Sequence, residues 1–139
     1  MSATHIVQTH YTEGMSFETV VNDHSIQLDM DEAGGGNDTG PRPKPLILSA
    51  LGGCTGIDVI SILNKMKVLY SNFTIEVNGT LSDEHPKVYT HIHIKYLISL
   101  NTGDQEKMIK AVNLSLDKYC GVSAMLKKVC PVTSEIIYR

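Results

Sequence analysis

With 139 residues, the chain is long enough for one domain with a substantial core and short for two, so we expect a single domain over residues 1–139. A net charge of −3, only 6% aromatic residues and no basic run argue against a nucleic-acid partner. The N-terminal residues lack the charged and apolar segments of a secretory signal, and three cysteines, an odd number, do not indicate an extracellular disulfide scaffold. We therefore expect a cytoplasmic protein that neither spans nor binds a membrane.

The N-terminal third of the sequence alternates between short β-prone runs and turn residues. The runs cover 5–11, 16–21 and 25–30, and the sequences TEG and NDH separate them, a pattern typical of a β-meander. Residues 31–45 then contain four glycines and three prolines and are expected to form a long loop. This loop is not a phosphate-binding loop, because it lacks the Gly-Lys-Ser/Thr ending.

A long apolar segment follows the loop. Residues 46–66 carry apolar side chains all round the helical wheel, which predicts a helix buried on most of its surface. Gly52, Gly53 and Gly56 lie in this helix around Cys54, although each glycine costs about 0.5–1 kcal/mol relative to alanine in a helix interior. Their missing side chains would let another backbone or a ligand approach the thiol closely.

Two alternating segments come next in the chain. Residues 73–81 place Phe73, Ile75, Val77 and Gly79 on one face, and residues 88–100 do the same with Ile92, Ile94, Tyr96 and Ile98. Period-2 alternation is typical of half-buried strands, so the pair predicts a long antiparallel hairpin.

The period changes again after residue 100. Residues 101–120 predict a helix whose apolar stripe consists of Ile109, Val112, Leu116 and Tyr119. Residues 122–129 predict a second, short helix, and 132–139 a last strand. The predicted order is β-β-β-α-β-β-α-α-β, an α+β arrangement without a parallel βαβ repeat.

The three cysteines differ in their surroundings. Cys54 is either a small buried hydrophobe or a reactive thiol. Asp58, one helical turn later, would raise its pKa, so activation would need a cation or donor from elsewhere. Cys120 precedes a predicted helix, whose N-terminal dipole favours the thiolate. Cys130 shows neither feature and is interpreted as structural.

Two histidines share a strand face. His91 and His93 have a spacing compatible with metal ligation, but the solvent-exposed face of a half-buried strand is the interpretation we favour. Because no further ligand is near in the sequence, we expect no metal and no cofactor.

The segment PKPLILSALGGCTGIDV, followed later by CGVS, resembles the two-cysteine pattern of the OsmC / organic hydroperoxide resistance family. Cys54 matches the first cysteine of that pattern, within a central helix. Cys120 and Ser123 match the second, with Gly121 in place of the usual proline. The order of elements matches as well. The resemblance implies an OsmC-like fold with a long central helix, as an intertwined homodimer with its sites at the subunit interface.

The same resemblance implies thiol peroxidase chemistry and a role in the response to oxidative stress. Cys54 would attack an organic or hydrogen peroxide and form a sulfenic acid, and Cys120 would condense with it to a disulfide. A dithiol reductant, for example one of the lipoyl type, would then restore both thiols. By the dipole argument alone Cys120 is the more acidic thiol, so the sequence leaves open which cysteine ionises more readily.

Active hydroperoxide reductases of the family use an arginine from the N-terminal strands, oriented by a glutamate before the central helix. This chain has arginine only at positions 42 and 139, and Lys44 or Pro45 stands where the glutamate is expected. Arg42 and Lys44 are therefore the candidates for charge or peroxide binding, with Gly53, Asp58 and Ser123 as pocket residues. The alternative is a catalytically inactive homodimer that binds a small apolar ligand in the same pocket.

Overall fold

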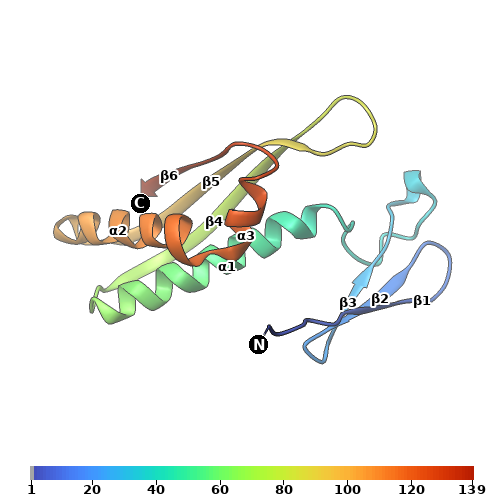
Figure 1. Cartoon of the computed structure of the whole chain (residues 1–139), viewed down its shortest axis with the longest axis horizontal. Helices are drawn as coiled ribbons and strands as arrows, with labels where there is room; N and C mark the ends of the chain where they lie inside the picture. Colours follow the sequence, from blue (N-terminus) through green and yellow to red (C-terminus); the bar gives the residue numbers. More distant parts are fainter. Residues whose placement is uncertain (1) are drawn as a thin grey trace. The chain divides into compact units, whose positions relative to one another are not determined.

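The structure is a computed structural model that describes residues 2–139, and the chain divides into two units, one up to Ile47 and the other from Leu48 to Arg139. The first unit contains β1 (Gln8–Tyr11), β2 (Phe17–Val21), β3 (His24–Leu28) and a 3₁₀ turn (Glu32–Gly34). The second contains most of α1 (Pro45–Lys65), then β4 (Tyr70–Leu81), β5 (Tyr89–Leu100), a 3₁₀ turn (Thr102–Asp104), α2 (Gln105–Leu114), a π-helical turn (Ser115–Tyr119), α3 (Gly121–Leu126) and β6 (Val132–Tyr138). Figure 1 shows these elements in chain order.

The first unit is a three-stranded antiparallel meander, as predicted. Its sheet has the order β1-β2-β3, and the NDH turn joins the last two strands. Asn22 and Asp23 have φ values of 51° and 64°, the left-handed conformation that tight hairpin turns require. Asn and Asp tolerate this conformation better than most residues, so the local sequence fixes the turn.

The loop over residues 31–45 folds around the carboxylate of Asp29. That side chain is buried and accepts the amide N–H groups of Met30 (2.8 Å), Asn37 (3.1 Å) and Thr39 (3.1 Å), together with the Thr39 hydroxyl (2.7 Å). These hydrogen bonds, that from the Thr39 hydroxyl first, hold the pKa of Asp29 well below its ordinary value. The Gly/Pro-rich loop is thus a built structure, and it contains one short 3₁₀ turn.

The predicted long helix is confirmed as α1, with Pro45 at its first position, where a missing N–H costs least. Its fully buried residues are Leu51, Thr55, Val59 and Leu63, which form a single stripe at a spacing of four residues. The expectation of burial on most of the surface is wrong within this chain, since only 22% of its most apolar stretch is buried. By length and composition α1 is the one helix among residues 2–139 that could cross a membrane, and core helices of globular proteins share these features.

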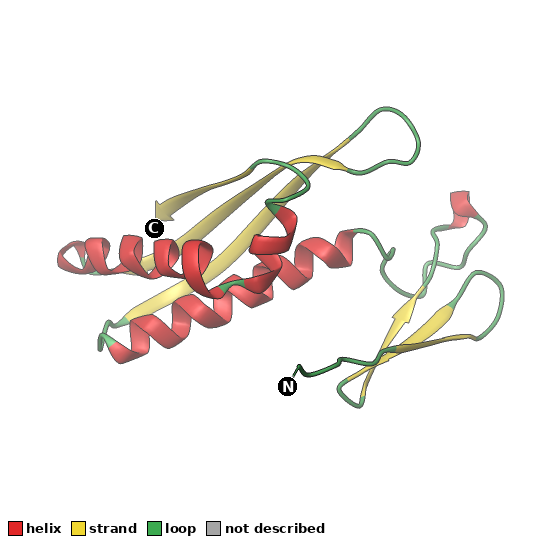
Figure 2. Ribbon diagram, viewed as in Figure 1, coloured by secondary structure: helices red, strands yellow, loops and turns green. Residues whose placement is uncertain are grey.

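The predicted hairpin is confirmed as β4 and β5, and the sheet contains one parallel pair that the sequence did not predict. β4 pairs antiparallel with β5, and β5 pairs in parallel with β6, so the sheet order is β4-β5-β6. Parallel neighbours need a crossover connection, and here α2, the π-helical turn and α3 provide it. Figure 2 shows these helices and α1 alongside the sheet.

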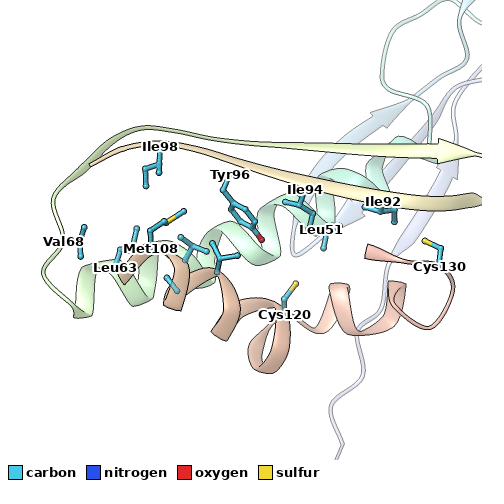
Figure 3. Close-up of a cluster of buried hydrophobic side chains, with 13 residues drawn as sticks. Leu51, Leu63, Val68, Ile92, Ile94, Tyr96, Ile98, Met108, Cys120 and Cys130 are labelled. Atoms are coloured by element: carbon cyan, nitrogen blue, oxygen red, sulfur yellow. The ribbon is translucent and has the colours of Figure 1, made fainter. Parts of the chain in front are cut away.

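The core of the second unit lies between this sheet and the helices. The inward face of β5 contributes Ile92, Ile94, Tyr96 and Ile98, all fully buried as the alternation predicted. Each such aliphatic side chain contributes about 1.5–3 kcal/mol through burial. They pack against the buried stripe of α1 and against Met108, Ala111 and Val112 of α2. Figure 3 shows this cluster, with the Cys120 thiol at its edge.

The predicted stripe of the helix over residues 101–120 is partly wrong. Ile109 and Tyr119 are exposed, and the buried positions are Met108, Ala111, Val112 and Ser115, followed by Cys120. The π-helical turn after Leu114 explains where this pattern ends. Its hydrogen bond joins residues five positions apart instead of four, so the next buried residue after Ser115 is Cys120.

Candidate active site

The glycines around Cys54 serve two different purposes. A Cβ atom at Gly52 would lie 3.5 Å from Val77 Cγ2, and one at Gly56 only 2.9 Å from Ile75 Cδ1. The distance at Gly52 is an ordinary contact, whereas at Gly56 a side chain would press on Ile75, so Gly56 is the glycine that lets α1 lie close against β4. At Gly53 an added Cβ would meet nothing within 4 Å, so this residue lies on a face that the described chain leaves uncovered.

The π-helical turn and the start of α3 hold Cys120 in place. The Cys120 N–H donates to the Ser115 carbonyl at 2.7 Å. As N-cap of α3, Cys120 accepts the Ser123 N–H at its Sγ (3.3 Å), and the Ser123 hydroxyl donates to the Cys120 carbonyl (3.0 Å). Cys120 is only 3% exposed, so it is much less accessible than the half-buried Cys54.

The fold brings Cys54 and Cys120 together. Burial raises the pKa of the Cys54 thiol, and the Cys120 thiol adds to this through a side-chain hydrogen bond and its charge, as does the carboxylate of Asp58. The Val122 N–H, at the start of α3, acts in the opposite direction and lowers this pKa. The Asp58 effect expected from the sequence is thus present, and together with burial it disfavours the Cys54 thiolate.

The candidate cations belong to the first unit, whereas the cysteines belong to the second. The Arg42 guanidinium pairs with Asp38 at 2.7 Å and donates to the Gly40 carbonyl at 2.8 Å. Lys44 is exposed. Within residues 48–139, no Lys or Arg side chain is among the groups that act on the pKa of Cys54.

A buried chain of hydroxyl groups beside the cysteines was missed by the sequence analysis. Thr55 Oγ1 lies 2.7 Å from Tyr96 Oη and 2.7 Å from Ser115 Oγ, and the Ser115 hydroxyl donates to Asp58 Oδ2 at 2.9 Å. Burial raises the pKa of Tyr96 to about 12, so it remains a neutral phenol. Polar residues at positions 55 and 115 carry no sequence pattern that distinguishes a buried network from a solvated surface.

A cavity of about 410 Å³ opens beside this chain, between α1 and the segment of α2 and the π-helical turn. Its lining includes Asp58, Lys65, Lys110 and Tyr119 but not Cys54. The cavity therefore reaches the carboxylate end of the hydroxyl chain rather than the thiols.

Cys130 and the two histidines lie elsewhere in the second unit. Cys130 is buried in the core, as its structural interpretation required. His91 Nε2 and His93 Nδ1 both hydrogen-bond Thr133 Oγ1, at 2.8 and 2.7 Å, and His93 Nε2 lies 2.6 Å from Glu135. Among residues 2–139, no group of three potential ligands is arranged to hold a metal ion.

Comparison with known protein families gives a match over residues 35–135, to the family described as OsmC-like protein. The chain is also 32% identical to Protein YhfA of Escherichia coli K12 over 124 residues, which cover 88% of this chain and 90% of the relative.

Solved structures show the same fold. A hypothetical protein from Aquifex aeolicus VF5 superimposes with a TM-score of 0.81 at 27% identity and covers 99% of both chains. An organic hydroperoxide resistance protein OsmC from Legionella pneumophila gives a TM-score of 0.68 at 15% identity, covering 97% of each chain. At the latter identity the similarity establishes the fold alone.

Proposed function

Because the chain belongs to the OsmC-like protein family, we propose that it is a thiol-dependent peroxidase that reduces organic or hydrogen peroxide through Cys54 and Cys120. We propose further that it works as a cytoplasmic homodimer in the response to oxidative stress. The Legionella protein of the same fold is named for organic hydroperoxide resistance, which is consistent with this substrate class.

One observation carries the proposal. Cys54 and Cys120 are far apart in the sequence, yet their thiols are close enough to interact directly. Two free thiols that act on one another, one half-buried and the other buried, are consistent with an attacking and a resolving cysteine. Cys54 is the more accessible of the two and is therefore the proposed site of attack.

The proposed reaction has three steps. The Cys54 thiolate attacks one peroxide oxygen, the O–O bond breaks, and the leaving alkoxide takes a proton, so that Cys54 becomes a sulfenic acid and the peroxide an alcohol. The Cys120 thiol then condenses with the sulfenic acid, an S–S bond forms, and the hydroxyl group leaves with the thiol proton as water. A dithiol, with the lipoyl type as the first candidate, reduces this disulfide by exchange and is itself oxidised.

The first step requires thiolate, which burial and Asp58 disfavour. The Val122 N–H is the one group in the second unit that favours it. We propose that Arg42 or Lys44 supplies the missing positive charge. Replacement of each by Ala should then raise the pKa of Cys54, measured as the pH dependence of its alkylation rate, and an unchanged pKa in both variants would exclude these residues.

The homodimer is supported by the surface of α1. Ile57 is 73% exposed, and Ala50 and Gly53 lie at helical spacing from it, so that an apolar face of the helix remains uncovered. A second copy of the chain would cover this face and enclose the half-buried Cys54.

The test of the function is peroxide turnover with a lipoyl-type dithiol. Cys54→Ser should abolish turnover, whereas Cys130→Ser is the matched control and should retain it, because Cys130 is a buried thiol that is not among the groups acting on Cys54. Cys120→Ser keeps an N-cap acceptor for Ser123 but removes the resolving thiol, so it should accumulate Cys54 sulfenic acid. Full turnover by Cys54→Ser would refute the assignment.

The alternative function is a homodimer that binds a small apolar ligand without catalysis. The raised pKa of Cys54 favours it. A Cys54 pKa near or above about 8.5 in the assembled protein supports ligand binding, and a value below about 6.5 supports catalysis.

A further inference from the structure

Ser115 is the residue that connects the helix bearing Cys54 with the backbone of Cys120. Its side chain is fully buried and bonds to α1 through Thr55 Oγ1 (2.7 Å) and Asp58 Oδ2 (2.9 Å). Its carbonyl, on the other side of the same residue, accepts the Cys120 N–H at 2.7 Å. Ser115 therefore hydrogen-bonds both α1 and the Cys120 backbone.

The local backbone makes this connection unusual. Ser115 begins the π-helical turn, so its carbonyl is paired with the residue five positions later instead of four. That residue is Cys120, which leaves helical geometry (φ −76°, ψ 100°) and caps α3. The extra residue in the turn is thus what allows Ser115 and Cys120 both to face the core.

We infer that Ser115 is a positioning residue for the Cys54–Cys120 pair, because its hydroxyl ties the Cys120 turn to α1 and so sets the separation of the two thiols. The inference rests on the proposed redox function, since it concerns the second step: formation of the S–S bond with loss of water. Disulfide formation depends strongly on the relative position of the two sulfur atoms. A small displacement of one reacting group is enough to reduce the rate or equilibrium of such an intramolecular step greatly.

The experiment measures the equilibrium of the Cys54–Cys120 disulfide in buffers of oxidised and reduced dithiothreitol, by mass spectrometry of trapped protein. We expect Ser115→Ala to lower the equilibrium constant by about tenfold, since it removes both hydroxyl bonds to α1, and Thr55→Val to lower it by about threefold, since the Ser115–Asp58 bond remains. Thr55→Val preserves side-chain size, so it tests the bond if Ser115→Ala fails to fold. In the double variant the loss should not exceed that of Ser115→Ala, because Ser115→Ala already removes the bond to Thr55.

Tyr96→Phe is the matched control. It removes another buried hydroxyl of the same chain but leaves both Ser115 bonds to α1 and the bond to Cys120 intact. It should lower thermal stability while leaving the disulfide equilibrium within about twofold of the wild type. A role of Ser115 in general stability alone would affect all three variants alike.

Several outcomes overturn the inference: an equilibrium constant within twofold of wild type in Ser115→Ala and Thr55→Val, an equal loss in Tyr96→Phe, or no disulfide in the wild type. The peroxidase proposal is tested separately. If the wild-type disulfide forms in dithiothreitol buffer and responds to Ser115→Ala, but peroxide produces none, the peroxidase proposal fails and the positioning role stands.

Discussion

The carboxylate of Asp58 acts on two nearby residues, Ser115 and Cys54. It accepts a hydrogen bond from Ser115, and its charge raises the pKa of the Cys54 thiol. We predict that Asp58→Asn accelerates alkylation of Cys54 by iodoacetamide severalfold at pH 7, because the charge is removed while an oxygen acceptor for Ser115 remains. The rate is measured by peptide mass spectrometry at timed intervals.

Asp117→Asn provides the control, because this carboxylate lies in the nearby π-helical turn but is not among the groups that act on Cys54. Its alkylation rate should match the wild type. Equal rates in wild type and Asp58→Asn would contradict the electrostatic account.

Asp29 makes the first unit sensitive to acid. Its pKa in the folded protein lies below the ordinary value of 3.8, so the stability that its carboxylate contributes is complete above about pH 4 and is lost as the pH falls towards the folded value. We predict that the amides of Asn37 and Thr39 lose hydrogen-exchange protection at low pH. In Asp29→Asn they should already be poorly protected at pH 7, since one amide oxygen cannot replace two carboxylate oxygens.

Asp23→Asn is the control for this prediction, because it changes an Asp at the tip of the β2–β3 hairpin where Asn is equally suited to a positive φ. Retained protection of Asn37 and Thr39 in Asp29→Asn would show that the loop does not depend on the carboxylate.

At the scale of the elements, two glycines of α1 have different predicted roles: Gly56 in the packing of the chain and Gly53 in the proposed dimer. Gly56→Leu should destabilise the protein by about 1–3 kcal/mol, because its side chain would press against Ile75 of β4. At Gly53 an added Cβ would meet nothing within 4 Å, so Gly53→Leu should instead weaken the proposed dimer. Urea denaturation and light scattering distinguish the two results. A loss of stability in Gly53→Leu without dissociation would contradict the uncovered position of Gly53.

The sequence predicted most elements because their apolar periods are clear. Alternation placed Ile92 to Ile98 in the core, and the residue types Asn22 and Asp23 identified the hairpin turn. The phase of the helix after residue 101 was not predictable, because the π-helical turn is stabilised by the buried bonds of Ser115 rather than by local propensity.

The partner strand of β6 could not be predicted from the sequence either. Its residues predict a strand, but whether it joins β4, β5 or the other sheet depends on how the crossover through α2 and α3 packs. At the site, the resemblance identified Cys54 and Cys120. The links between them run through Thr55 and Ser115, whose hydroxyl groups have no periodic signature. The assignment of site residues remains a prediction, as does the single domain over residues 1–139.

At the scale of the whole molecule, the exposed face of α1 predicts the assembly. Ile57→Glu should raise the dissociation constant of the proposed homodimer by about tenfold or more, because a charge would be buried in an apolar interface. Ile109→Glu is a matched control, since Ile109 is also exposed but lies on α2. Sedimentation over a range of concentrations measures both. A monomeric wild type would contradict the proposal.

The most direct test of the central claim is peptide mapping after treatment of the reduced protein with one equivalent of an alkyl hydroperoxide. The account predicts a Cys54–Cys120 disulfide in the wild type, Cys54 sulfenic acid in Cys120→Ser, and Cys130 as a free thiol throughout. Two unmodified thiols at positions 54 and 120 after complete mixing, or oxidation confined to Cys130, would contradict it.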